Sequence, residues 1–427
     1  MLHKKIRQTF AITTLGCKVN QFESAEMIEQ FRSAGWEMVP FSEKADLYLV
    51  NSCTVTGRSD AESRRMLRRA RRANPEAKVI ATGCYAQVSP EELKALSEVD
   101  QVLGNQEKHD ILRHISLGNN QVSNFTDHTE TAELKLTSFA DHTRAFLQIQ
   151  TGCENGCSYC IVPIARGPNR SVPEQEVCAA VQQLAAQGYR EVVLTGIHLG
   201  AYQPDLAGLV QKLDDSASVE RLRLGSIEPN ELSDTLLELI ASSPRICHHL
   251  HIPLQSGSDT VLQRMKRRYD SSFYHMLIEK AARCLPDCFL ASDIIAGFPG
   301  ETEAEFLETC ELIATLPLAD LHIFPYSRRP GTTAASMPGQ VHPATIKERV
   351  SILQNLAKLK QKLFRQRFIG QELQVLGQRH DAVNGLVSGL SGNYLEVRFP
   401  CTENAVNRLY RVRITGQQHS YLTGTLS

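Results

Sequence analysis

Three cysteines within eight residues are the strongest chemical signal in this chain. Cys153, Cys157 and Cys160 form a C-x3-C-x2-C group directly after an apolar run. Three thiolates can bind three irons of a [4Fe-4S] cube and leave the fourth iron open, whereas most such clusters have four Cys ligands. Structural zinc is the alternative, but it needs a fourth ligand, usually from a second Cys or His pair nearby. The following residues, IVPIARG, supply none.

A second set of cysteines is dispersed over the first hundred residues. Cys17, Cys53 and Cys84 each follow a short apolar run, TFAITTLG, DLYLVNS or KVIATG, and each precedes a polar or helix-forming stretch. Strands that alternate with helices predict a parallel sheet, and ligands bind at the carboxyl ends of its strands. We therefore expect these three thiols to converge at one sheet edge. The alternative is that each Cys is a small buried hydrophobe.

The remaining pattern predicts the elements that position these residues. Residues 1–116 are expected to form a parallel α/β domain, and residues 117–143 a polar linker. Residues 144–367 are expected to form a central core of alternating strands and helices with a trailing linker helix. Six apolar runs in that core predict a partial (βα)6 TIM-like barrel with its chemistry at the carboxyl ends of the strands. Short alternating runs separated by Gly and Asn in residues 368–427 predict a small β-barrel. The fold class is α/β.

Composition narrows the class of protein further. The 427 residues carry 46 basic and 47 acidic side chains, a net charge of −1, and 42% are hydrophobic. These values exclude wholesale disorder, and no apolar run reaches the roughly 20 residues of a membrane-spanning helix. The amino terminus also lacks a signal-peptide pattern. We expect a soluble, intracellular chain with no membrane partner.

Weaker signals lie at predicted strand ends and on one predicted helix. Thr195, Gly196, Glu228, Gln255 and Phe298 stand where a cofactor could bind, although each could equally form a turn. His249 and His251 alternate on one strand, which favours buried core positions over a metal site. The run RRMLRRARR gives a helix with one basic face, which indicates either a phosphate track for RNA or an ordinary solvated surface. That face includes Arg64, Arg68 and Arg72.

Many segments of the chain resemble the radical S-adenosylmethionine methylthiotransferase family. TLGCKVNQFES, VNSCTVTGRSD and TGCYAQ resemble its amino-terminal domain, and TGCENGCSYCIVPIARG, HIPLQSGSD and IIAGFPGE its central domain. The segment GLSGNYLEV resembles the RNA-binding TRAM module. The resemblance implies two [4Fe-4S] clusters, one held by each set of three cysteines, with S-adenosylmethionine on the open iron of the central one. It also implies cofactor contacts by Tyr159 and the strand-end residues, and RNA contacts by Tyr394 and Arg411.

By the same resemblance the reaction inserts a methylthio group into an unactivated C–H bond of tRNA in the cytoplasm. GCKVNQ and PYSRRPGT are most similar to the branch that acts on N6-threonylcarbamoyladenosine at position 37, next to the anticodon. Isopentenyladenosine in tRNA and an aspartate of a ribosomal protein are the alternative substrates. An electron donor such as flavodoxin is implied, and the sulfur source stays open. A zinc-stabilised RNA-binding protein is the alternative from another class.

Overall fold

The computed structural model describes residues 8–125, 143–401 and 406–427. The chain divides into two compact units. Unit 1 contains residues 1–140, 150–176 and 327–335, and unit 2 contains residues 141–149, 177–326 and 336–427. Among the described residues, no helix combines the length and the apolar character needed to cross a bilayer.

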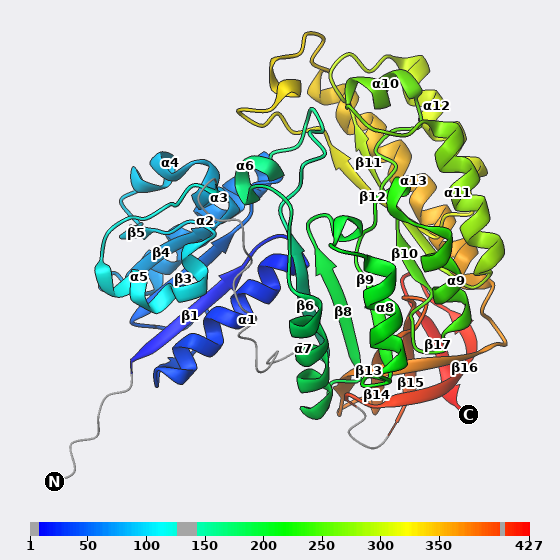
Figure 1. The fold of residues 1–427 in the computed structure, drawn as a ribbon, viewed down its shortest axis with the longest axis horizontal. Helices are drawn as coiled ribbons and strands as arrows, with labels where there is room; N and C mark the ends of the chain where they lie inside the picture. Colours follow the sequence, from blue (N-terminus) through cyan, green and yellow to red (C-terminus); the bar gives the residue numbers. More distant parts are fainter. Residues whose placement is uncertain (1–7, 126–142, 402–405) are drawn as a thin grey trace. The chain divides into compact units, whose positions relative to one another are not determined.

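Unit 1 is built on the expected parallel sheet. Its strands lie in the order β2-β1-β3-β4-β5 and all pair in parallel: β1 (Thr9–Thr14), β2 (Glu37–Met38), β3 (Leu47–Ser52), β4 (Lys78–Gly83) and β5 (Gln101–Val102) (Figure 1). Its helices are α1 (Lys18–Ser33), α2 (Gly57–Ala73), α3 (Cys84–Val88), α4 (Pro90–Lys94), η1 (Glu107–Asp110) and α5 (Ile111–Leu117). Side chains alternate along each strand, so each face of the sheet has its own core. Tyr48 and Val79 belong to one cluster, and Leu49 and Ile80 to the other.

The predicted linker, residues 117–143, is only partly described, because residues 126–142 lie outside the described part of the chain. The described start of this stretch is attached to the sheet of unit 1. Gln121 forms a parallel bridge with Leu103, and the Ser123 backbone N–H donates to Glu107 Oε1 at 3.0 Å. Residues 118–123 therefore extend the edge of the sheet beyond β5.

Six strands and their helices confirm the partial barrel. The strands are β6 (Arg144–Thr151), β8 (Glu191–Gly196), β9 (Arg221–Leu224), β10 (His249–His251), β11 (Phe289–Ala296) and β12 (Asp320–Pro325). They form sheets in the orders β7-β6-β8-β9 and β10-β11-β12, and bridges between residues 222 and 246 and between 226 and 251 connect β9 to β10. The short β7 (Arg170–Ser171) pairs antiparallel with the end of β6. The helices are α6 (Val162–Arg166), α7 (Glu174–Ala186), α8 (Leu206–Asp215), α9 (Asp234–Ser242), α10 (Asp259–Arg264), α11 (Ser271–Cys284) and α12 (Glu303–Thr315).

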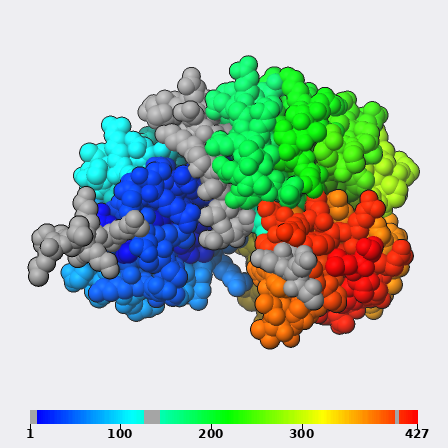
Figure 2. Space-filling model, turned by 90° about the horizontal axis from the view of Figure 1, so that it is seen from below, coloured from blue at the N-terminus to red at the C-terminus, as the bar shows by residue number. Residues whose placement is uncertain are grey.

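The carboxyl-terminal segment forms the expected closed β-barrel. After helix α13 (Pro343–Gln366), its strands close in the order β13-β14-β15-β17-β16: β13 (Glu372–Asp381), β14 (Leu386–Ser391), β15 (Glu396–Pro400), β16 (Leu409–Gln417) and β17 (Leu422–Leu426). Figure 2 shows this barrel packed directly against the rest of unit 2. Phe289 of β11 and Phe364 of α13 belong to the same hydrophobic cluster as the barrel interior, so the barrel shares a core with its neighbours.

Buried charges complete this junction within unit 2. Glu191, at the start of β8, has no solvent exposure and accepts from Arg223 at 2.8 Å. Arg223 also donates to the Ser391 carbonyl, and Arg221 donates to the Leu390 carbonyl at 2.9 Å. The two arginines thus connect β9 to the small β-barrel, mainly through backbone carbonyls of the barrel.

Candidate active site

The three dispersed cysteines lie at the carboxyl ends of three neighbouring strands, as the sequence predicts. Cys17 precedes α1, Cys53 directly follows β3, and Cys84 begins α3 after β4. Cys17 is exposed, whereas Cys53 and Cys84 are buried. Burial raises the pKa of the Cys53 thiol, and the neighbouring Cys84 and Cys17 raise it as well.

Two glycines keep the backbone close to these thiols. Gly16 has φ +93°, and a Cβ added to it would lie 2.8 Å from Cys53 Sγ. Gly83 has φ +95°, and a Cβ there would lie 2.5 Å from the Ser52 backbone N and O. Both positions require glycine because of their left-handed backbone and their crowding. The result is a cradle of three thiols, open on the Cys17 side, which suits a thiolate-ligated cluster with one free metal position.

The C-x3-C-x2-C loop also belongs to unit 1. Cys153, Cys157 and Cys160 are all half-buried and stand on a loop between β6 and α6. The Cys160 N–H donates to the Cys157 carbonyl at 3.1 Å, which makes a tight turn. The Cys153 N–H donates to the Gly167 carbonyl, also at 3.1 Å. The loop therefore returns on itself and presents three thiols from one short segment.

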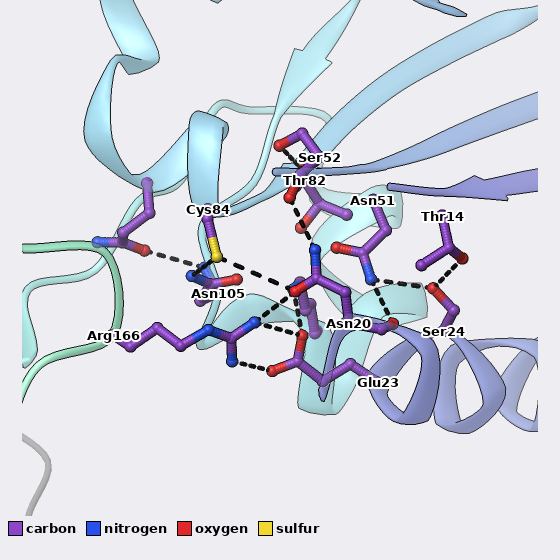
Figure 3. A network of polar contacts seen from close by, with 12 residues as sticks. Thr14, Asn20, Glu23, Ser24, Asn51, Ser52, Thr82, Cys84, Asn105 and Arg166 are labelled. Carbon is purple, nitrogen blue, oxygen red and sulfur yellow. Dashed lines mark hydrogen bonds and ion pairs between the residues drawn. The ribbon is translucent and has the colours of Figure 1, made fainter. Parts of the chain in front are cut away.

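A buried polar network connects the helix after this loop to the dispersed cysteines (Figure 3). Arg166, at the end of α6, donates to Glu23 Oε1 and to Asn20 Oδ1, both at 2.5 Å. Lys108 donates to Glu23 Oε2 at 2.6 Å. Burial alone would raise the pKa of Glu23, but Arg166 and Lys108 together hold it at about 2. Asn105 Nδ2 lies 3.7 Å from Cys84 Sγ.

Sequence reasoning missed this network. Glu23, Lys108 and Arg166 are 85 or more residues apart in two of their three pairings, and each is an ordinary charged residue in its local context. One available signal was the position of Arg166, six residues after the last Cys of the loop.

Five of the expected cofactor residues stand at strand ends in unit 2, and Tyr159 stands in the cysteine loop of unit 1. Thr195 is buried at the end of β8, next to Gly196. Glu228 forms an ion pair with Arg267, yet burial raises its pKa. Gln255 has φ +71°, a left-handed conformation that is unusual for this residue type.

The packing around Phe298, His249 and His251 differs among the three residues. Phe298 is fully buried against the Tyr326 ring at 5.7 Å, so its side chain is a core residue and only its backbone remains for a cofactor contact. His249 stacks against Phe289 with 5.8 Å between ring centroids and lies 4.3 Å from the Tyr394 ring, which fits the expected core position. His251 is different, because its Nε2 pairs with Asp293 Oδ1 at 2.8 Å.

Asp293 of β11 contacts a histidine on each of the two strands that flank it, His251 of β10 and His322 of β12. His322 Nδ1 lies 3.2 Å from the Asp293 Oδ1 that His251 also contacts. Burial alone would raise the pKa of Asp293, but the two histidines hold it at about 2. Its neighbour Ser292 bonds to Tyr274 of α11, on the outer face of β11, so alternation turns Asp293 toward the barrel interior. His249 thus has the buried surroundings that the core interpretation expects, whereas His251 is half-buried with its Nε2 paired to Asp293.

Three of the expected RNA-contacting arginines are exposed. They are Arg68 and Arg72 of α2 and Arg411 of β16, although Arg68 lies 3.6 Å from Glu98 and Arg411 3.9 Å from Glu372. Arg64 is engaged, since it donates to Tyr85 Oη at 2.5 Å and pairs with Glu92. On its other side α2 buries Met66, Leu67 and Ala70, as expected for an amphipathic helix.

Tyr394 packs at a junction inside unit 2, and its expected RNA contact stays a prediction. Its ring lies between Arg223, 5.0 Å from the ring centroid, and the His249 ring. Arg144 and Phe289 also pack on it. The Tyr394 ring therefore stabilises the junction between the small barrel and the (βα)6 barrel.

Comparisons with known proteins agree with this arrangement. Residues 9–104 match the model described as "Uncharacterized protein family UPF0004", and residues 147–313 match the Radical SAM superfamily. The threonylcarbamoyladenosine tRNA methylthiotransferase MtaB of Bacillus subtilis is 40% identical over 97% of this chain and 96% of its own. The enzyme of that name from Thermotoga maritima is 39% identical over 95% and 94%. A tRNA-2-methylthio-N(6)-dimethylallyladenosine synthase of Cereibacter sphaeroides is 34% identical over 97% of each chain.

Solved structures share the fold at low identity. The radical S-adenosylmethionine methyltransferase TsrM from Kitasatospora setae, with cobalamin and a [4Fe-4S] cluster bound, superposes with a TM-score of 0.58. The two chains are 14% identical, and the match covers 77% of each. At this identity the likeness concerns the fold alone.

Proposed function

This chain belongs to the family of radical SAM tRNA methylthiotransferases, and we propose that it converts N6-threonylcarbamoyladenosine beside the tRNA anticodon into its 2-methylthio derivative. The observation that carries the proposal is the nearly full-length likeness to methylthiotransferases of that substrate, at 35–40% identity in four of them. The site agrees with it, because a single unit holds two separate groups of three thiols.

The enzyme uses [4Fe-4S] clusters and S-adenosylmethionine. We assign Cys153, Cys157 and Cys160 to one cluster, and the dispersed cysteines to the second. Three ligands in each group leave one metal position for a non-protein ligand. The chemistry that these groups supply is hydrogen abstraction from carbon and delivery of a methylated sulfur.

The protein's side chains shield the thiols and orient the cofactor. The thiols of Cys53 and Cys84 are buried, so solvent reaches this group mainly on the Cys17 side. At the strand ends of unit 2, Thr195, Glu228 and the Gln255 backbone are proposed to orient S-adenosylmethionine. Glu228 suits this role because Arg267 fixes its carboxylate while burial keeps water away.

The exposed arginines are proposed to bind the tRNA backbone. Arg68, Arg69 and Arg72 project from the solvent side of α2, and Arg411 projects from the small barrel. Phosphate contacts of this kind position RNA without reading its sequence. An electron donor such as flavodoxin and a cytoplasmic location complete the proposal, since tRNA is modified in the cytoplasm and the reductive chemistry needs electrons.

The test is nucleoside mass spectrometry of bulk tRNA from cells with and without the gene. We expect deletion to remove the methylthio form of threonylcarbamoyladenosine and to accumulate its parent. Re-expression of the wild-type chain should restore the nucleoside, and the Cys17→Ala/Cys53→Ala/Cys84→Ala variant should not. Cys284→Ala is the matched control, because Cys284 is exposed at the end of α11 in unit 2, whereas both groups belong to unit 1.

Two alternatives make different predictions in the same experiment. Loss of the methylthio group from isopentenyladenosine would keep the chemistry and replace the substrate, as the 34% identical synthase suggests. If no tRNA nucleoside changes, tRNA is the wrong substrate, and a ribosomal-protein aspartate becomes the next one to test. A colourless, zinc-containing protein would contradict the cluster assignment itself.

A further inference from the structure

Arg166 connects the two cysteine groups through the interior of unit 1. It ends α6, the helix that follows the C-x3-C-x2-C loop, and its side chain is only 3% exposed. The guanidinium contacts both Glu23 oxygens, at 2.5 and 3.1 Å, and Asn20 Oδ1 at 2.5 Å. Such a two-pronged contact fixes the plane and position of an arginine far better than a single bond.

The fixed guanidinium lies beside the dispersed thiols. Asn20, which Arg166 contacts, is also the residue whose Oδ1 lies 4.0 Å from Cys84 Sγ. Arg166 therefore faces a carboxylate on one side and the thiol group on the other.

A second contact ties the same helix to the same thiols. Asn105 Nδ2 donates to the carbonyl of Ala165 at 2.7 Å, and that nitrogen lies 3.7 Å from Cys84 Sγ. The last two residues of α6 thus reach the Cys84 sulfur by two independent paths, one through Asn105 and one through Arg166.

Arg166 and Lys108 share the Glu23 carboxylate, and all three side chains are at most 7% exposed. An arginine stays protonated in a protein, so Arg166 is a permanent positive charge at this place. Arg166 Nη2 and Cys84 Sγ both contact Asn20 Oδ1, at 2.5 and 4.0 Å, so that charge lies next to the Cys84 sulfur.

We propose that Arg166 is a positioning residue for the cluster held by Cys17, Cys53 and Cys84, stabilising its thiolate ligands and raising its reduction potential. This rests on the ligand assignment made in the proposed function. A fixed positive charge favours the more negative, reduced state of a nearby cluster, so its removal should make the cluster harder to reduce. The geometry also makes α6 the element through which the loop of the first cluster supports the second.

The experiment isolates the second cluster. In a Cys153→Ser/Cys157→Ser/Cys160→Ser background, reconstituted without oxygen, we expect about four irons per chain. Arg166→Gln is compared there with Arg170→Gln. Arg170 is a matched control from the same segment, stacked on Phe125 at 5.4 Å and bonded to the Arg166 carbonyl. The readouts are iron loss to a chelator and the midpoint potential from a titration followed by electron paramagnetic resonance.

We expect Arg166→Gln to lose iron at least tenfold faster than Arg170→Gln. Its midpoint should fall by an amount equal to at least a tenfold change in the reduction equilibrium, which is 59 mV for one electron. Arg166→Lys keeps the charge but loses the planar contact, so it should restore the midpoint while iron loss stays fast.

Two outcomes would count against the proposal in separable ways. If the background itself binds no iron, the ligand assignment fails before Arg166 is touched, and the inference fails with it. If iron binds and Arg166→Gln matches Arg170→Gln in both readouts, Arg166 serves only the fold. Fluorescence of Trp36, in unit 1, verifies folding; where Arg166→Gln does not fold, Arg166→Lys against Arg170→Lys decides through the rate of iron loss.

Discussion

Replacing Glu191 by Gln should loosen the junction between the (βα)6 strands and the small β-barrel. Glu191 is fully buried and lies 2.8 Å from Arg223, 3.6 Å from Arg221 and 3.5 Å from Arg144. Burial alone would raise the pKa of Glu191, yet the arginines, with Arg223 first, hold it at about 2. Glutamine keeps the shape of the side chain and removes the only negative charge among these four groups.

Two independent estimates give the size of the effect. Holding the pKa of Glu191 near 2 instead of 4.5 corresponds to about 3 kcal/mol at about 1.4 kcal/mol for each tenfold change. Breaking a buried ion pair by removing one partner costs about 3–5 kcal/mol, because it leaves a buried charge uncompensated. The matched control is Glu220→Gln, whose exposed pair with Arg190 contributes at most about 1 kcal/mol.

Hydrogen exchange followed by mass spectrometry reads this junction directly. A loss of about 3 kcal/mol should speed exchange about 100-fold in peptides covering β9 and β14, which hold the arginines and their carbonyl partners. The control should change exchange less than about fivefold. Trp36, the only Trp of the chain, lies in unit 1, so its unfolding transition should not move. Equal exchange in Glu191→Gln and Glu220→Gln would refute the reasoning.

Two further predictions concern other parts of the structure. His248 Nδ1 pairs with Asp287 Oδ1 at 2.6 Å, a bond that raises the pKa of His248 and lowers that of Asp287. The histidine contributes stability below its unfolded pKa of about 6.5 and loses it as pH rises through the folded value, while the aspartate contributes above about 3.8. His248→Gln should therefore lower the melting temperature most between about pH 4 and 6.5, by an amount equal to less than about 1 kcal/mol because both groups are partly exposed, and a difference that grows toward pH 9 would contradict this. In unit 1, Gly83→Ala should destabilise the Trp36-detected transition by more than the about 1–2 kcal/mol expected for Gly35→Ala; both glycines have positive φ, but only Gly83 would place its new Cβ 2.5 Å from the Ser52 backbone, and equal denaturant midpoints would count against the crowding argument.

The parts of this structure that follow from local patterns could be predicted from the sequence. Apolar runs of six to ten residues predicted β1, β3, β4 and the strands of the (βα)6 barrel, and the parallel order of β1, β3 and β4 brought Cys17, Cys53 and Cys84 together. The strands β2 and β5 were not predicted, because two residues each leave no periodic signal.

Contacts between distant residues could not be read in the same way. The ion pair of Arg166 with Glu23 spans 143 residues, and the local sequence around either residue does not predict its partner. Tyr394 is a second case, since nothing in its local sequence predicts that its ring packs between Arg223 and His249. Local sequence gives the chemical type of a side chain, whereas its role depends on which remote segment covers it.

The discontinuous course of unit 1 has a consequence for the order of synthesis. Arg166 leaves the ribosome 82 residues after Cys84 (166 − 84), which at roughly 5–20 residues per second is a delay of about 4–16 s. The ion pair of Asp60 forms later still, because its buried partner Arg329, at 2.5 Å, belongs to the segment 327–335, which is synthesised later. A nascent amino-terminal sheet thus displays its three thiols before the charges that surround them are complete. During synthesis these cysteines are therefore accessible before Arg166 reaches Glu23 and Asn20.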